Sequence, residues 1–95
     1  MLGWQIDERP EIVLQMCKAS KMIKKKYDLW KHLVKFSGPF LPGAGWRTEK
    51  LSGKLKKFYS ARLDKKWRII FEIDGKIKTI VILSITPHLY DKIKR

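Results

Sequence analysis

The 95-residue chain carries 22 Lys and Arg residues against nine Asp and Glu, which gives a formal net charge of +13. This length excludes a barrel enzyme and a complete dinucleotide-binding fold, because both need far more chain. Hydrophobic residues make up 44% of the sequence, which is enough for a core and excludes a disordered chain. We therefore expect a single folded domain, residues 1–95, whose partner is anionic.

Cysteine and histidine are too few for several kinds of site. The single cysteine, Cys17, cannot form an internal disulfide, which favours a reducing compartment. One Cys and two well-separated His residues also give no zinc-binding pattern, so no metal and no cofactor are expected. No stretch approaches the roughly 18 apolar residues of a membrane span, and the N-terminus lacks the pattern of a signal peptide. We expect a cytoplasmic protein without membrane contact, in which Cys17 is a small buried apolar residue.

The first half of the chain has the spacing of helices. A strand is expected at residues 2–6, and Pro10 in a first turn begins a helix. A break at 18–20 follows, where Ser20 can cap a second helix that ends at 37–39. Lysines lie mostly on the outer side of this second helix and form a solvated face, a contact to the anionic partner, or both. Its apolar stripe comprises Ile23, Tyr27, Trp30, Leu33 and Val34.

The second half of the chain reads as a loop followed by an antiparallel meander. Asp74-Gly75 is typical of a two-residue hairpin. Residues 80–83 are apolar on both faces, which predicts a strand in the interior of the sheet. The expected segments are a loop at 38–48 and strands at 58–64, 67–73 and 76–85.

Strand alternation brings two arginines together. If the apolar faces of the first two strands meet the same core, Leu63 lies opposite Trp67 and Arg62 lies opposite Arg68. Like charges in direct cross-strand contact are destabilising, so the pattern favours an anion between the two guanidinium groups, and a phosphate suits them. Two alternatives stay open. Both arginines could be splayed into solvent, or a two-residue loop could pair Arg62 with Ile69.

Further basic residues surround this hairpin. The segment 46–68 holds nine Lys and Arg against two acidic residues, a net charge of +7. His88 and Tyr90 follow the last strand, and with Asp91 they could form a general acid/base set for phosphodiester chemistry. A His beside a Pro at a strand end is also often a plain surface residue. The lysines that this segment offers to the anionic partner are Lys50, Lys54, Lys56 and Lys57.

Several segments resemble the toxins of bacterial toxin–antitoxin modules. The runs 49–53, 58–63 and 66–71 resemble the RelE/ParE superfamily, and within it the HigB-like branch. The ending at 85–90 is similar to YafQ-like toxins, which have a His shortly after the last strand. HigB-like chains tend to end in an Asp-Tyr-His run, whereas this sequence has Thr86-Pro87-His88.

The resemblance implies an α+β fold in which a helical hairpin packs on a twisted, mainly antiparallel sheet of four to five strands. It also implies an endoribonuclease that cuts messenger RNA without a metal, on the ribosome, and is neutralised by a cognate antitoxin. The ribose 2′-hydroxyl would attack the adjacent phosphate and leave a 2′,3′-cyclic phosphate. The catalytic residues would be Arg62, Arg68, His88 and Tyr90.

Two other functions stay open at this point. ParE-like members of the superfamily keep the fold, lack ribonuclease activity and inhibit DNA gyrase. A non-catalytic nucleic-acid-binding module would also explain the positive charge.

Overall fold

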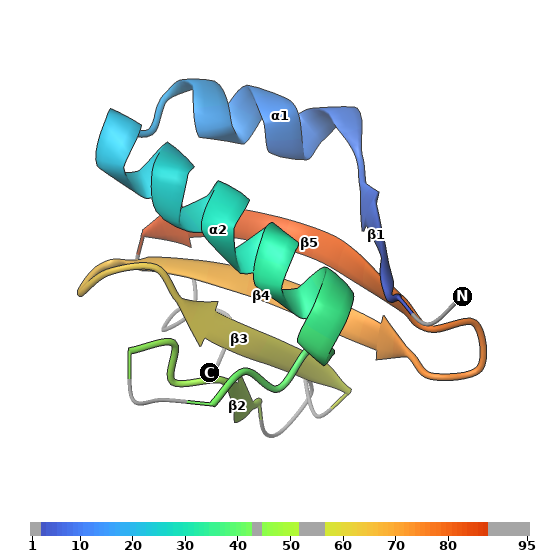
Figure 1. Ribbon diagram of the computed structural model, residues 1–95. Coiled ribbons are helices and arrows are strands. Elements are labelled where there is room, and N and C mark those ends of the chain that lie inside the picture. Colours follow the sequence, from blue (N-terminus) through green and yellow to red (C-terminus); the bar gives the residue numbers. More distant parts are fainter. Residues whose placement is uncertain (1–2, 43–44, 52–56, 88–95) are drawn as a thin grey trace.

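The computed structural model describes residues 3–42, 45–51 and 57–87, which form two helices on one face of a five-stranded sheet (Figure 1). The strand order is β1-β5-β4-β3-β2; β1 pairs in parallel with β5, and the other pairs are antiparallel. The expected α+β architecture is confirmed. The elements are β1 Gln5–Glu8, α1 Pro10–Cys17, α2 Lys21–Ser37, β2 Glu49–Lys50, β3 Phe58–Arg62, β4 Trp67–Asp74 and β5 Thr79–Pro87.

Local sequence signals set the helix boundaries as predicted. Pro10 occupies the first turn of α1, where its missing N–H group costs nothing. The Ser20 hydroxyl caps α2 by accepting a hydrogen bond of 3.2 Å from the Ile23 N–H. Gly38, with a φ of 87° that favours glycine, follows the end of α2 and donates its N–H to the Val34 carbonyl.

The core fills the space between the helices and one face of the sheet. Trp30 of α2 lies at its centre, fully buried, with its ring centroid 5.3 Å from that of Phe71 on β4. Trp4, Trp46 and Trp67 pack partly buried against this core, so large aromatic rings supply much of the buried area of a small domain. The predicted core-facing side of α2 is confirmed: Leu33 is half-buried, and Ile23, Tyr27, Trp30 and Val34 are buried.

Strand β5 lies in the interior of the sheet, between β1 and β4, as its apolar sequence predicted. A bulge interrupts its pairing with β4, because Ser84 pairs with Ile70 whereas Ile82 pairs with Phe71. The extra residue, Leu83, allows Ile82 and Ile85 both to reach the core although they are three positions apart. Alternation alone would have placed them on opposite faces.

Three expectations about the ends of elements were wrong. Cys17 is exposed, because the buried face of α1 is formed by Ile12 and Met16 and the next residue along turns away from it. The β4–β5 connection has four residues, 75–78, because Asp74 pairs with Thr79. The Asp74 carboxylate accepts the Lys76 N–H at 3.2 Å and thereby organises this longer turn. The first strand covers Gln5–Glu8 rather than 2–6.

Neither helix combines the length and apolar content that crossing a membrane requires, within the part of the chain described.

Candidate active site

Arg62 and Arg68 are direct partners in the β3–β4 ladder, as the sequence predicted. The Leu63 N–H donates to the Trp67 carbonyl at 2.9 Å, which closes the hairpin around the three residues 64–66. Leu63 and Ile69, each the residue directly after one of the arginines, are buried in the core. Because side chains alternate along a strand, both arginines belong to the sheet face turned away from the helices. We call this the arginine face.

The turn between the two strands is tied together by Asp64 and Arg68. The Asp64 carboxylate accepts the N–H groups of Lys66 at 2.8 Å and Trp67 at 2.7 Å. Nη1 of Arg68 donates to the backbone carbonyls of Asp64 at 2.9 Å and Lys65 at 3.3 Å. Arg68 therefore has a structural role in the turn, and one end of its guanidinium group is held in place by the backbone.

Arg62 has different surroundings. Its backbone N–H donates to the Trp46 carbonyl at 2.6 Å, which joins β3 to the chain before β2. Its side chain is half-buried, and Nε is inaccessible to water and has no hydrogen-bond partner within the described segments. An unsatisfied buried donor is costly. The guanidinium group of Arg62 would therefore gain more than an ordinary surface arginine from an anionic acceptor such as a phosphate oxygen.

The structure adds a carboxylate that the sequence reasoning missed. Strand β2 pairs Glu49 with Ser60, so Glu49 belongs to the arginine face, two positions along β3 from Arg62 or about 7 Å. Glu72 is also on this face, but it pairs with Phe58, four positions or about 14 Å along the strand from Arg62. A strand of only two residues, both charged and exposed, has no periodicity that a sequence pattern could reveal.

The predicted basic residues divide into two groups. Lys57 and Lys50 belong to the first group, which the structure describes. Nζ of Lys57 lies 5.5 Å from the centre of the Phe58 ring, which is on the arginine face. Lys50 pairs with Tyr59 and therefore belongs to the other side of β2. The strand β5 ends at Pro87, which pairs with Trp67, one residue pair beyond Arg68. The predicted residues outside the described part of the chain are Lys54, Lys56, His88 and Tyr90.

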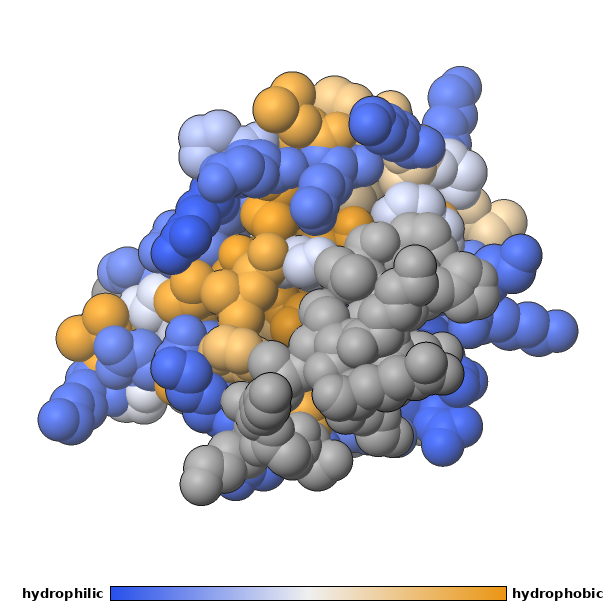
Figure 2. Space-filling model, turned by 180° about the vertical axis from the view of Figure 1, so that it is seen from behind, coloured by the Kyte–Doolittle hydropathy of each residue, from blue (hydrophilic) through white to orange (hydrophobic). Residues whose placement is uncertain are grey.

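Figure 2 shows the molecule from behind, the side opposite to the view of Figure 1. Hydrophilic side chains gather around the margin of this side, and apolar surface lies toward its middle.

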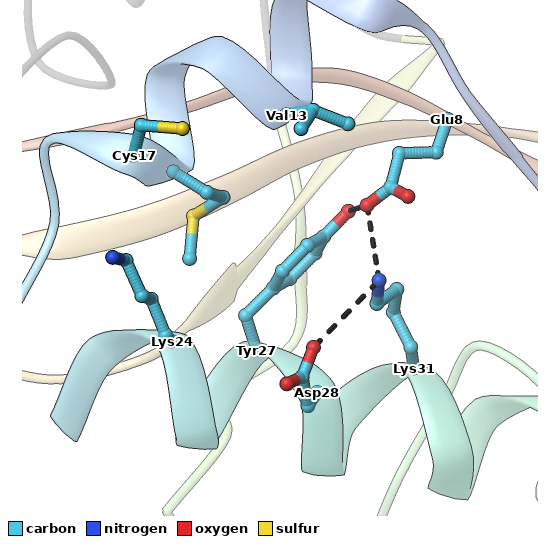
Figure 3. A pocket seen from close by; sticks show the side chains of 8 residues that line it. Glu8, Val13, Cys17, Lys24, Tyr27, Asp28 and Lys31 are labelled. Atoms are coloured by element: carbon cyan, nitrogen blue, oxygen red, sulfur yellow. Dashed lines mark hydrogen bonds and ion pairs between the residues drawn. The ribbon is translucent and has the colours of Figure 1, made fainter. Parts of the chain in front are cut away.

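A pocket of about 320 Å³ lies elsewhere, lined by residues of β1, α1 and α2 (Figure 3). The Tyr27 hydroxyl donates to the Glu8 carboxylate, and Nζ of Lys31 lies 3.1 Å from the same oxygen and 3.7 Å from Asp28. Cys17 lines the α1 side of the pocket. Since Glu8, Tyr27 and Lys31 satisfy one another, this group joins β1 to α2, and we assign it a structural role.

Burial and hydrogen bonding shift both acids of this group. Partial burial opposes the charged form of Glu8, but the hydrogen bonds from Tyr27 and Lys31 and the charges of Lys31 and Lys35 outweigh it and lower the pKa of the carboxyl group. Burial and the neighbouring Glu8 carboxylate raise the pKa of the Tyr27 hydroxyl strongly. Within residues 3–42, 45–51 and 57–87, no three His, Cys, Asp or Glu side chains gather to hold a metal ion.

Comparison with known proteins finds similarity only at the level of structure. No family model matches the chain, and no curated protein matches its sequence. RelE in the archaeal RelE–RelB complex from Pyrococcus horikoshii superposes with a TM-score of 0.74 at 20% identity, over 90% of this chain and 96% of that one.

Two further solved structures have a similar fold. The heterotetrameric YoeB–YefM toxin–antitoxin complex from Staphylococcus aureus matches with a TM-score of 0.66 at 25% identity, over 92% of this chain and 99% of that one. A mutant of YafQ from E. coli matches with a TM-score of 0.64 at 17% identity, over 90% of this chain and 94% of that one. The layer of two helices on a five-stranded, mostly antiparallel sheet is thus the fold of the RelE/ParE superfamily of toxins.

Proposed function

We propose that this chain is the toxin of a type II toxin–antitoxin module and an endoribonuclease that cleaves messenger RNA on the ribosome, which inhibits translation. The observation that carries the proposal is the direct pairing of Arg62 with Arg68 on the sheet face that the helices leave uncovered. In a chain with the fold of RelE, YoeB and YafQ, two arginines at one point form a site for a phosphate that is being cleaved.

The reaction needs charge stabilisation more than any other contribution. The ribose 2′-oxygen attacks the adjacent phosphorus, the bond from phosphorus to the 5′-oxygen breaks, and the products are a 2′,3′-cyclic phosphate and a free 5′-hydroxyl. Negative charge builds on the phosphoryl oxygens in the transition state. Positioned guanidinium groups stabilise such charge and remain protonated at any physiological pH. We assign this role to Arg62 and Arg68.

Two proton transfers accompany the bond changes. A base must accept the proton of the 2′-hydroxyl, and an acid must protonate the leaving 5′-oxygen. Among the described strands, Glu49 is the carboxylate nearest to Arg62 along the register of the arginine face, and we assign it the role of base. His88, the residue that follows the end of β5, is the proposed acid, and Tyr90 is proposed to orient the nucleotide.

Binding of the RNA strand is assigned to the basic residues of the segment before β3. Lysine ammonium groups neutralise backbone phosphates without regard to sequence, so this contribution should weaken as salt increases. The proposed contacts are Lys50, Lys54, Lys56 and Lys57.

The proposed protein partner is a cognate antitoxin. RelE was solved with RelB, and YoeB with YefM in a toxin–antitoxin complex. A chain of net charge +13 would associate fastest with an acidic partner, because complementary charge steers the encounter.

The decisive experiment maps RNA ends after the purified chain is incubated with translating ribosomes. We expect new 3′ ends that carry a cyclic phosphate, and their loss in His88→Ala with the fold retained by circular dichroism. Intact messages together with inhibited DNA supercoiling would instead identify a gyrase inhibitor. Salt-sensitive RNA binding without cleavage or growth arrest would identify a plain binding module.

A further inference from the structure

Helix α2 exposes a row of large apolar side chains. Met22, Leu29 and Phe36 are 70%, 47% and 77% exposed, although most large apolar residues of this domain are buried. They are seven residues apart, so they recur every two turns on one side of the helix and span about 21 Å. We call these three residues the α2 stripe. The stripe is separate from the buried side of α2, which packs on the sheet.

The charges beside the α2 stripe all have one sign. Lys25 and Lys26 follow Met22 by three and four positions, which places them between Met22 and Leu29 on the same side of the helix. Nζ of Lys26 lies 5.0 Å from the centre of the Trp46 ring, so an aromatic surface adjoins the stripe. Asp28 is the only acidic residue of α2, and it turns to the other side, toward Lys31.

We infer that the α2 stripe binds an acidic amphipathic helix of a partner protein, which, if the proposed function holds, is the antitoxin. A partner helix with apolar residues at the same seven-residue spacing would pack along the stripe as in a coiled coil. Carboxylates beside those apolar residues would meet Lys25 and Lys26. Burial of the exposed Leu29 and Phe36 side chains supplies affinity, and the charges supply direction and rate.

Two other occupants fit less well. A second copy of this chain would bring lysine-rich helices and net charges of +13 together, which opposes association. RNA would suit the lysines, but a phosphate backbone offers no counterpart to three aliphatic and aromatic side chains in a row. The stripe thus favours a protein that is both apolar and acidic.

The position of the stripe has a consequence for neutralisation. The α2 stripe lies in the helical layer, and the arginine face lies on the other side of the sheet. A helix bound at the stripe therefore does not contact the arginines. The partner must anchor at the stripe and reach the arginine face with a separate segment, or it must hold the chain away from the ribosome.

The test measures binding of the protein encoded by the reading frame next to this gene, by calorimetry with the full chain. The variant Leu29→Glu/Phe36→Glu removes two anchors and adds repulsion, and its affinity should fall at least about 100-fold. The matched controls are Leu14→Glu on α1 and Ile77→Glu in the β4–β5 turn, which are 66% and 65% exposed and should bind as the unmodified chain does. Lys25→Glu should slow association more than it speeds dissociation.

RNA cleavage on ribosomes is measured for the same variants. We expect Leu29→Glu/Phe36→Glu to cleave at the unmodified rate and to escape neutralisation. An affinity of the double variant within about threefold of that of the unmodified chain would overturn the inference. Loss of cleavage with binding retained would also overturn it, because the stripe would then be a contact to the ribosome. Absence of cleavage in every variant, with binding still dependent on the stripe, would reject the proposed ribonuclease and leave the docking surface in place.

Discussion

Arg62 and Arg68 face each other across β3 and β4, yet they are held in different ways. Nη1 of Arg68 is bonded to the carbonyls of the hairpin turn, whereas Nε of Arg62 is buried without a hydrogen-bond partner among the described residues. The two residues should therefore respond differently to substitution. Arg62 is expected to matter for activity alone, and Arg68 for both activity and stability.

Replacement of Arg62 by Ala should reduce RNA cleavage by about 100- to 1,000-fold, the range found when a single charge-stabilising group is removed from an active site. The free energy of unfolding should stay the same or rise, because the change removes a like charge from the position opposite Arg68 and an unsatisfied donor. Cleavage rates and urea unfolding measure the two effects. Arg62→Lys serves as the control: it keeps the charge but loses the planar fork, and it should recover only part of the activity. Full activity of the Ala variant would remove Arg62 from the mechanism.

Replacement of Arg68 by Ala should reduce both the rate of RNA cleavage and the free energy of unfolding. Loss of the bonds from Nη1 to the turn carbonyls should lower the free energy of unfolding by about 1–2 kcal/mol, and cleavage should fall as well. The ratio of cleavage to folded fraction, measured at a temperature where the variant remains folded, separates the two effects. Unchanged stability would show that the contacts to Asp64 and Lys65 contribute little.

Two carboxylates of the arginine face, Glu49 and Glu72, give a matched pair. Glu49→Gln should reduce cleavage by about 100-fold or more by removing the proposed base. Glu72→Gln, on the same face but about twice as far from Arg62 along the strand, should leave cleavage unchanged. Equal effects of the two substitutions would indicate a general electrostatic influence instead of a proton transfer by Glu49.

The sequence predicted the arginine pair from strand alternation. Alternation identified which residues of 58–63 and 67–73 face the core, and matching these faces required a three-residue turn with Arg62 opposite Arg68. The alternative of a two-residue turn stayed open in the sequence, and the observed register excludes it. The same reasoning failed for Cys17 and for the β4–β5 turn. A residue at the edge of a helical stripe is buried or exposed according to the neighbouring helix, and Asp-Gly fits more than one type of turn.

Pairing over long sequence distances could not be predicted at all. Glu49 joins the arginine face only because two residues of β2 pair with β3. The link from Glu8 to Tyr27 joins residues 19 positions apart and depends on how α2 lies over β1. No local pattern contains this information.

The cap of α2 gives a direct test of how the helix begins. Ser20→Ala removes the acceptor of the Ile23 N–H and should lower the free energy of unfolding by about 1 kcal/mol. Ser20→Asp restores an acceptor and adds a favourable charge at the N-terminus of the helix, so it should match or exceed the original stability. Urea unfolding of the three proteins decides the matter, and equal midpoints for the unmodified chain and the Ser20→Ala variant would mean that the cap has no energetic role.

The contact between Tyr27 and Glu8 should make stability depend on pH at both ends of the scale. The pKa of Glu8 is lowered in the folded chain, so its contribution is present above the unfolded value, about pH 4, and is lost as pH falls through the folded pKa. The pKa of Tyr27 is raised, so its contribution is present below about pH 10 and is lost as pH rises beyond that value.

Tyr27→Phe keeps the packing and removes the hydroxyl, which leaves the partly buried Glu8 carboxylate with one donor fewer. We expect a loss of about 1–2 kcal/mol at neutral pH. The difference between the two proteins should shrink below about pH 4, where Glu8 of the unfolded chain is protonated, and above about pH 10, where Tyr27 of the unfolded chain ionises, because both changes favour unfolding of the unmodified chain. Urea midpoints across this range provide the measurement. Glu8→Gln should abolish the acidic limb and weaken the alkaline one, because the Glu8 carboxylate helps to raise the pKa of Tyr27. A constant difference at every pH would show that the hydroxyl contributes through packing and not through its bond to Glu8.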